Sequence, residues 1–478
     1  MEEKNNKITP IEDFINKVKE VTKEMGYEEN ENIIFRNATK VPSKDFNKRA
    51  YFGYINPEEE PSGPYYDFSL VIFPQQDLKY CVVALVVGSY GFKNDLDLAM
   101  LPWTRRLFNR LRKKEGQFFF KNNFSNIDTP SSLYNFIKSK DEYKCLKEVI
   151  KVYKNYIQAC QLINWSKVDE RKDIKGWLAQ FAKLKGLAKN ETERKNIDNA
   201  IRTDLDVHKN LTDCDIYNIL KKDRYVILQG APGTGKTYNA LKISNKNFKK
   251  GNVFFEQFHA ETSYSDFVFG ITPKLNSNNL IYEPKQGILY KAIKQAKDSK
   301  DNVLLIIDEI NRANLSNVLG PVFYLFEKNH DNRNVNLKLG DIELSVLPEN
   351  LYVIGTMNTA DRSLAVVDFA LRRRFTWITL RPCIINSTEL NKGEYFHKEE
   401  FNKFNELFEK YATDEELNLQ PGQSYFITKS PQDSSMNDRL QYELMPLMKE
   451  YFNEGYLEKA KDEFCDYFYV KISKLMYE

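Results

Sequence analysis

The sequence contains little of what stabilises secreted proteins or anchors proteins in membranes. Six cysteines are scattered over 478 residues, without the close spacing of a zinc site or a disulfide framework. No uninterrupted apolar stretch approaches the ~20 residues of a membrane-spanning helix. The first residues, Met1–Asn6, are charged or polar apart from the initiator methionine and do not lead into the apolar core of a signal peptide. We therefore expect a cytoplasmic protein with reduced thiols and no membrane contact.

An excess of charge of either sign is also missing. The 70 Lys and Arg residues nearly balance the 67 Asp and Glu residues, which gives a net charge of +3. Bulk charge thus offers no argument for nucleic-acid binding, and any such argument needs a local patch. The content of 42% hydrophobic and 29% charged residues is that of an ordinary folded protein. The length predicts two or three domains.

Sequence patterns divide the chain into four regions. Residues 1–185 mix helical and strand patterns and predict a separate α+β N-terminal domain. Residues 186–214 are rich in Lys, Asn, Asp and Glu and predict a charged helical linker. Residues 215–380 alternate strand and helix signals, which is typical of a parallel sheet covered on both faces. Residues 381–478 show mainly helical periodicity and predict a helical lid.

Five strands are predicted in the α/β region, and together they predict a central five-stranded parallel sheet. They are Tyr225–Gln229, Val253–Phe258, Val303–Asp308, Leu351–Thr356 and Phe375–Leu380.

The most specific motif is Gly-Ala-Pro-Gly-Thr-Gly-Lys-Thr, which follows the first of these strands and precedes a helical pattern. That context is the one a phosphate-binding P-loop requires. Its glycines let the backbone fold tightly, so that successive N–H groups can point at phosphate oxygens. Lys236 supplies a charge for the β- and γ-phosphates, and Thr237 supplies a hydroxyl for Mg²⁺. The predicted nucleotide-binding residues are Gly230, Ala231, Pro232, Gly233, Thr234, Gly235, Lys236, Thr237 and Tyr238.

Two acids end the third predicted strand. A buried strand would deliver Asp308 beside Thr237, where its carboxylate can support the Mg²⁺. Glu309 would then orient or deprotonate the attacking water. Another strand ends at Asn358, whose amide could hydrogen-bond the water or the γ-phosphate. Arginines suit the spreading charge of a phosphoryl transition state because their fork is planar and permanently charged, and residues 372–374 are three consecutive arginines.

Several of these segments resemble the McrB branch of the AAA+ superfamily. Residues 308–314 read Asp-Glu-Ile-Asn-Arg-Ala-Asn, residues 357–363 read Met-Asn-Thr-Ala-Asp-Arg-Ser, and residues 368–375 read Asp-Phe-Ala-Leu-Arg-Arg-Arg-Phe. Residues 258–270 and 419–426 look like further parts of the same pattern, so that the resemblance spans about Asp215 to Phe452.

This resemblance implies a GTP-hydrolysing ring, commonly a hexamer, that drives a separate nuclease subunit in modification-dependent restriction. It implies that Arg312 is an arginine finger acting on the neighbouring subunit, that Arg373 and Arg374 compensate charge, and that Asn358 senses the water or phosphate. The implied partner is a McrC-like nuclease of the PD-(D/E)xK type. The P-loop itself does not distinguish guanine from adenine, so GTP rests on the resemblance, and an ATP-dependent remodeller or a nucleotide-gated assembly switch is the alternative.

The N-terminal region carries one basic segment, residues 103–114, with six basic residues and no acid. As a helix it would bury Trp103, Leu107 and Leu111 and present Arg106, Arg110 and Lys113 on another face. That face either contacts DNA phosphates or is simply solvated.

Aromatic residues of the same region suggest a base-binding pocket or, alternatively, ordinary core packing. Residues 51–68 resemble the domain found ahead of some McrB-type motors, which implies recognition of double-stranded DNA, including modified DNA. Asp266 with Glu283-Pro-Lys285 imitates a nuclease metal site, but Pro284 predicts an interrupted strand. We therefore expect no nuclease activity in this chain.

Overall fold

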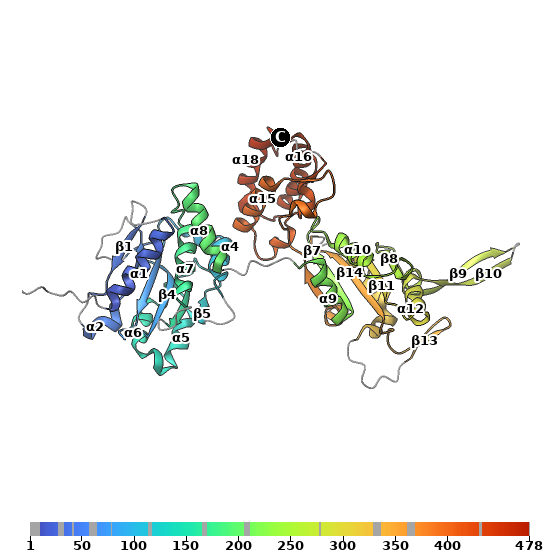
Figure 1. Cartoon of the computed structure of the whole chain (residues 1–478), viewed down its shortest axis with the longest axis horizontal. Helices are drawn as coiled ribbons and strands as arrows, with labels where there is room; N and C mark the ends of the chain where they lie inside the picture. The colour runs from blue at the N-terminus through green and yellow to red at the C-terminus, as the bar shows by residue number, and fades with distance from the viewer. Residues whose placement is uncertain are drawn as a thin grey trace, which may run out of the picture. The chain divides into compact units, whose positions relative to one another are not determined.

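The chain folds as two compact units, Met1–Lys209 and Asn210–Glu478 (Figure 1). The structure is a computed structural model. It describes residues 10–26, 33–40, 43–56, 65–77, 79–112, 117–164, 170–204, 211–276, 279–327, 336–360, 369–429 and 433–477. Within these ranges, no helix has the length and apolar character needed to cross a bilayer.

The N-terminal unit is built on a six-stranded antiparallel sheet with the order β1-β2-β3-β4-β6-β5. Its strands are β1 (Ile34–Asn37), β2 (Phe52–Ile55), β3 (Phe68–Pro74), β4 (Tyr80–Val87), β5 (Gln117–Phe120) and β6 (Ile157–Asn164). Its helices are α1 (Pro10–Glu24), α2 (Ser43–Arg49), α3 (Leu96–Met100), α4 (Pro102–Asn109), α5 (Ser132–Lys138), α6 (Lys144–Tyr153), α7 (Glu170–Leu184) and α8 (Glu191–Asp204). The prediction of a mixed α+β domain is confirmed.

Both faces of this sheet are buried. Alternate side chains of a strand point to opposite faces: Val83 and Leu85 of β4 pack in the core that α1, α4, α7 and α8 cover, whereas Val82 and Ala84 pack in the core under α5 and α6. The strand pattern of residues 80–87 is accordingly a continuous apolar run. Of the aromatic residues predicted to form either a base-binding pocket or core, Tyr51, Phe52, Tyr54 and Tyr65 are core residues, whereas Tyr90 is 58% exposed.

A helix of the N-terminal unit lies in the stretch predicted as a charged linker. Ile197, Ala200 and Ile201 of α8 are buried in the same core as α7. Three apolar residues at helical spacing are enough to dock this otherwise charged helix. The compositional signal for a linker missed them because it counted charges over the whole segment.

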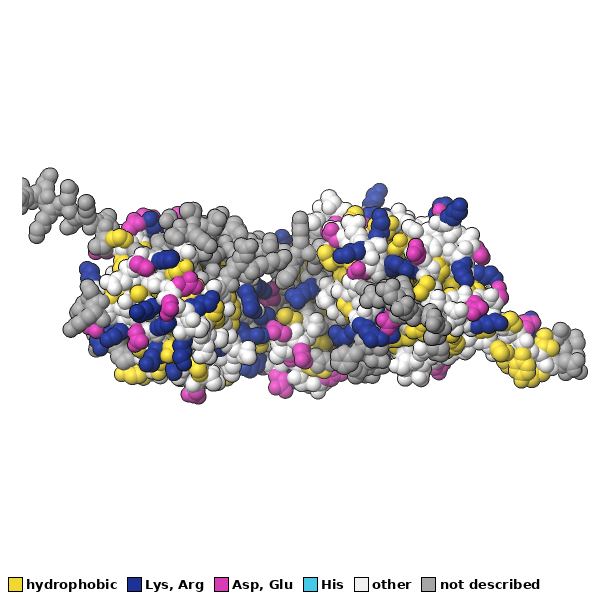
Figure 2. Space-filling model, turned by 90° about the horizontal axis from the view of Figure 1, so that it is seen from below, with side chains coloured by type: hydrophobic (Ala, Val, Ile, Leu, Met, Phe, Trp, Pro, Cys, Tyr) yellow, Lys and Arg dark blue, Asp and Glu magenta, His cyan; other side chains and the backbone are white. Residues whose placement is uncertain are grey.

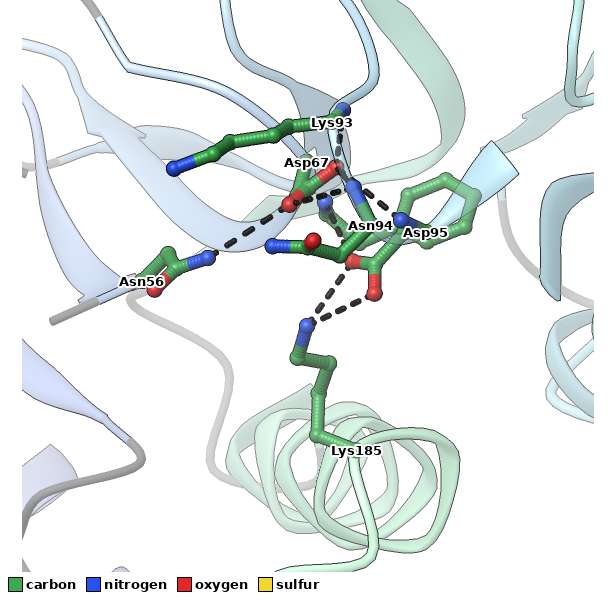
Figure 3. A network of polar contacts seen from close by, with 7 residues as sticks. Asn56, Asp67, Lys93, Asn94, Asp95 and Lys185 are labelled. Carbon is green, nitrogen blue, oxygen red and sulfur yellow. Dashed lines mark hydrogen bonds and ion pairs between the residues drawn. The ribbon is translucent and has the colours of Figure 1, made fainter. Parts of the chain in front are cut away.

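A polar network ties β3 to the end of α7 (Figure 3). The Asp67 carboxylate accepts backbone N–H groups of Lys93, Asn94 and Asp95 at 2.7, 2.9 and 3.0 Å. The Asp95 carboxylate in turn accepts the Lys185 ammonium at 2.8 Å. Burial raises the pKa of Asp67, but the three backbone N–H groups outweigh it and hold that pKa below its usual value. The network fixes the chain where it leaves the sheet toward α3.

The second unit contains a five-stranded parallel sheet with the order β15-β7-β14-β11-β8 (Figure 1). Its strands are β7 (Tyr225–Gly230), β8 (Val253–Gln257), β11 (Val303–Asp308), β14 (Leu351–Asn358) and β15 (Thr376–Thr379). Side chains of β11 alternate between two cores: Leu304 and Ile306 meet α9 (Asp213–Asp223) and α10 (Lys236–Asn247), while Leu305 and Ile307 meet α12 (Ile288–Asp298). The predicted sheet and its five strands are confirmed.

A separate helical core completes this unit and confirms the predicted lid. It contains buried aromatic and methionine side chains of four helices. These are α15 (Lys398–Tyr411), α16 (Asp433–Arg439), α17 (Met445–Asn453) and α18 (Lys461–Ile472). The smaller elements of the unit are α11 (Tyr264–Phe267), α13 (Leu315–Leu319), α14 (Phe369–Arg374), β12 (Leu337–Leu339), β13 (Ile342–Leu344), β16 (Tyr395–Phe396) and β17 (Ile427–Thr428).

A two-stranded hairpin, β9 (Phe269–Asn276) and β10 (Asn279–Gln286), projects from the α/β core (Figure 1). Its register pairs Ile271 with Pro284, so the prediction that Pro284 interrupts a strand was wrong. Both strands of an isolated hairpin are edges, where a proline is tolerated. One face carries exposed apolar side chains, among them Leu275 at 77% and Tyr282 at 69% exposure, and yellow side chains gather there in Figure 2.

Candidate nucleotide-binding site

The P-loop connects β7 to α10 at the carboxyl edge of the parallel sheet. Gly233 and Gly235 have φ values of +80° and +84°, which L side chains rarely adopt. A Cβ on Gly230 would lie 2.3 Å from the carbonyl oxygen of Leu380. The loop therefore needs glycine at these three positions.

Lys236 begins α10 and is 8% exposed. Its ammonium donates to the carbonyl oxygens of Gly230 and Ala231, both at 2.9 Å. The Thr234 hydroxyl also donates to the Ala231 carbonyl, at 2.8 Å. The charge is thus held at the start of a helix, where the backbone dipole favours an anion. Farther along α10, Tyr238 is 55% exposed.

Asp308 ends β11 and is bonded to two hydroxyl groups. Its Oδ1 accepts from the Oγ1 atoms of Thr237 and Thr356, each at 2.7 Å. The aspartate is 8% exposed. Carboxylate and hydroxyl oxygens are ligands that Mg²⁺ prefers, so Thr237 and Asp308 fit the predicted metal. Thr356 was not predicted, although a polar residue inside the apolar strand β14 was the available signal.

Glu309 lies where the chain leaves β11, with φ of +52° in the left-handed region. Its backbone N–H donates to the Thr356 hydroxyl at 3.0 Å. The Thr356 hydroxyl therefore donates to the Asp308 carboxylate and accepts from the Glu309 backbone. The Glu309 carboxylate lies 3.7 Å from Nε of Arg312, whose side chain is half exposed.

Asn358 ends β14 beside the P-loop, because the register pairs it with Gly230. The side chain is 9% exposed, and its Oδ1 accepts the N–H of Ala360 at 3.2 Å. Its carbonyl accepts from the side chain of Asn311, at 3.2 Å. The tips of β7, β11 and β14 thus bring Lys236, Thr237, Asp308 and Asn358 to one edge of the sheet. The following residues of the Met-Asn-Thr-Ala-Asp-Arg-Ser segment, from Asp361 on, lie outside the described residues.

Comparison with known proteins assigns this unit. Residues 225–375 match the AAA domain of the dynein-related subfamily. Over 275 residues the chain is 38% identical to the type IV methyl-directed restriction enzyme EcoKMcrB subunit of Escherichia coli (strain K12), covering 52% of this chain and 58% of that protein. The nucleotide-binding unit is an AAA+ module of the McrB type.

A second relative is the type II restriction enzyme BsuMI component YdiS of Bacillus subtilis (strain 168). It is 28% identical over 192 residues, which cover 32% of this chain and 55% of that protein. The matches therefore span little more than half of either relative.

The arginine cluster of the McrB-type unit is bound to an acid in the structure. Arg373 and Arg374 both contact the Glu327 carboxylate, at 2.6 and 2.5 Å. The Arg374 guanidinium also lies 4.6 Å from the ring centroid of Phe323 and is 8% exposed, whereas the Arg373 side chain is 65% exposed. Of the two, Arg373 is the one with access to a neighbouring molecule. Glu327 had no signal in the sequence.

A loop of the lid packs directly on the P-loop of the McrB-type unit. The Gly422 N–H donates to the Pro232 carbonyl at 2.8 Å, and the Ser424 N–H donates to the Gly233 carbonyl at 3.1 Å. The Gln423 side chain donates to the Thr234 carbonyl at 2.9 Å and accepts the N–H of Cys383. The resemblance marked this segment without giving its residues a role. In the structure this segment joins the lid to the phosphate loop through three hydrogen bonds.

Proposed function

We propose that this chain is a Mg²⁺-dependent nucleoside triphosphatase that works as a ring motor in a restriction system. The observation that carries the proposal is the joining of Thr237, Asp308 and Thr356 by two 2.7 Å hydrogen bonds beside the P-loop lysine. Such a cluster supports a role for this hydroxyl and carboxylate in binding Mg²⁺ next to a phosphate-binding loop. The chain's place among the McrB-type AAA+ proteins supports the same function.

The proposed roles follow from these positions. Lys236 and the loop N–H groups bind the β- and γ-phosphates, while Thr237 and Asp308 hold Mg²⁺, which neutralises phosphate charge when bound. Glu309 orients and deprotonates the attacking water. Asn358, at the neighbouring strand end, positions that water or senses the γ-phosphate.

Arginines complete the site between copies of the chain. The Arg312 side chain is half exposed, so we propose that assembly turns it toward the neighbouring copy's phosphate. Arg373, which is exposed, would add positive charge near the phosphates. Arg374 would help to fix the position of Arg373, because both pair with the Glu327 carboxylate. A site completed by a neighbour requires a homo-oligomer, for which we propose a hexamer.

The cellular work is proposed from the relatives. Both are parts of restriction enzymes, which supports recognition of double-stranded and modified DNA by the N-terminal unit and coupling to a McrC-like PD-(D/E)xK nuclease subunit in the cytoplasm. We propose GTP as the substrate in preference to ATP.

Two substitutions test the triphosphatase. Lys236→Ala is expected to abolish both binding and turnover of GTP and ATP, because it removes the ammonium group that binds the phosphates. Lys242→Ala is the matched control, since Lys242 lies on the same helix but pairs with Asp213. Unchanged turnover in Lys236→Ala would refute the assigned site, and a strong preference for ATP would favour a remodeller over a GTP-driven motor.

Glu309→Gln is expected to retain nucleotide binding and to lower phosphate release by about 10²–10⁴-fold, the usual contribution of a positioned general base. Glu283→Gln, on the hairpin, is its control. Phosphate release that is unaffected by Glu309→Gln would instead favour the nucleotide-gated switch.

A further inference from the structure

A polar cavity of about 250 Å³ lies in the N-terminal unit and is lined by residues of α4, of the turn that continues it and of the edge strand β5. Its walls carry the cationic side chains Arg105, Arg112 and Lys121 and the amides Asn109 and Asn122. Among the described residues that line it there is no carboxylate. The cavity is thus a concentration of positive charge in a chain whose total charge is nearly balanced.

The core fixes the helical side of this cavity. Arg105, Asn109 and Arg112 are spaced four and three residues apart, so they share one face of α4 and the turn that continues it. On another face Leu107 and Leu111 are 1% and 5% exposed. Because these leucines are anchored, the helix cannot rotate its arginines away from the cavity.

The strand side is equally rigid. The rings of Phe118 and Phe120 stack at 6.3 Å with 8° between their planes, and Phe119 packs against Phe136 on the other side of the sheet. Lys121 follows, 7% exposed, and its ammonium donates to the carbonyl oxygens of Asn126 and Asn155. The cationic group is therefore fixed in place.

The buried ammonium favours an anionic ligand. Burial lowers the pKa of Lys121 to about 8, against the opposing influence of Asp128. The lysine is still mostly charged at pH 7, and an anion in the cavity would offset part of the cost of burying that charge.

We propose that this cavity receives a phosphate group of the DNA backbone. Planar guanidinium forks match phosphate oxygens, and amide side chains beside them add hydrogen-bond donors. The cavity is smaller than the ~300–1,000 Å³ of typical small-molecule sites, which suits one phosphate with its sugar. The inference rests on the proposed DNA recognition and gives it a location, formed by Arg105 and Arg112 instead of the predicted face of Arg106, Arg110 and Lys113. Lys113 lies outside the described residues.

The test uses the full chain and a fluorescent 30-base-pair duplex, with anisotropy titrations between 50 and 200 mM salt. Arg105→Gln/Arg112→Gln is expected to weaken binding and to lower the slope of log K against log salt by about 1, because the contact with one phosphate is lost. The control is Arg110→Gln, on the same helical segment but outside the cavity. Lys121 is left unchanged because it holds two backbone carbonyls, and an unaltered thermal unfolding curve verifies folding of the N-terminal unit.

The possible results distinguish the proposed phosphate cavity from the proposed DNA recognition by the N-terminal unit. Loss of affinity and slope in the double variant but not in Arg110→Gln supports the cavity. If the double variant binds the duplex as tightly as the parent, the cavity proposal is overturned while DNA recognition stands. The same holds if Arg110→Gln weakens binding as much as each arginine of the double variant does on average. A parent chain that binds no duplex overturns the proposed DNA recognition too. If inorganic phosphate then binds and the double variant abolishes its binding, the cavity serves a free phosphate.

Discussion

At the scale of single residues, Thr356 joins the two acids of the nucleotide site. Its hydroxyl donates to Asp308 and accepts from the backbone of Glu309. A residue in this position orients the carboxylate that we propose to bind Mg²⁺, and it hydrogen-bonds the backbone at the left-handed turn of Glu309. It would act through these neighbours and not on the substrate, so it is a positioning residue.

Thr356→Val keeps the shape of the side chain and removes both hydrogen bonds. Hydrogen bonds to charged groups contribute about 1.5–3 kcal/mol, so turnover is expected to fall roughly tenfold to a hundredfold. Nucleotide affinity measured without Mg²⁺ should stay near that of the parent. Thr379→Val, which removes a hydroxyl bonded to Gln229 on the neighbouring strand, serves as control. Equal turnover in Thr356→Val and the parent would show that Asp308 needs no such support.

At the scale of elements, the lid loop packs against the backbone of the P-loop. A Cβ on Gly422 would lie 2.0 Å from the carbonyl carbon of Gly233. No flexible side chain can yield there, because the obstacle is backbone. The two loops can remain in contact only with glycine at this position.

Gly422→Ala is therefore expected to separate the lid loop from the phosphate loop. Nucleotide affinity should fall at least tenfold, and amide exchange in residues 420–429 should rise, as followed by hydrogen–deuterium exchange. Gly251→Ala is the control, since an added Cβ there meets nothing within 4 Å. Unchanged exchange and affinity would mean that the two loops contact each other without energetic consequence.

At the scale of the whole molecule, the proposed motor depends on copies of the chain meeting. Turnover per chain is expected to rise with protein concentration through the assembly transition, because Arg312 would reach its phosphate only in a neighbour. A flat rate across the transition, measured with sizing of the same samples by light scattering, would contradict the shared site.

Mixing variants sharpens this test. Arg312→Ala and Glu309→Gln chains should each be nearly inactive alone, yet mixed assemblies should recover part of the activity, since some interfaces then pair an intact Glu309 with an intact Arg312. Recovery in the mixture cannot arise if both residues act within one chain. Absence of recovery, with mixed assemblies demonstrated, would place Arg312 in its own chain's site.

The sequence alone determined the P-loop and the parallel strands, because each can be recognised within a few consecutive residues. The P-loop needs glycines within a few residues of one another, and the parallel strands are continuous apolar runs because both their faces are buried. These patterns were sufficient to predict the five-stranded sheet, the lid and the residues at the strand tips. Short edge elements gave weaker signals: no individual strand was predicted for β5 or β6. The helical character of α8 was predicted, but its charged residues hid the face that docks on the core.

Tertiary structure decided every contact between segments distant in sequence. Only strand register shows that Thr356 reaches Asp308, 48 residues earlier, and only lid packing brings Gln423 to Thr234. The arginine pair meets Glu327, which no local pattern distinguished, and the basic helix turns Arg105 and Arg112 toward β5 because its leucines point into the core. Residue chemistry and local periodicity can be determined from the sequence of a short segment. The partner of a side chain cannot, because it depends on which surfaces become buried together.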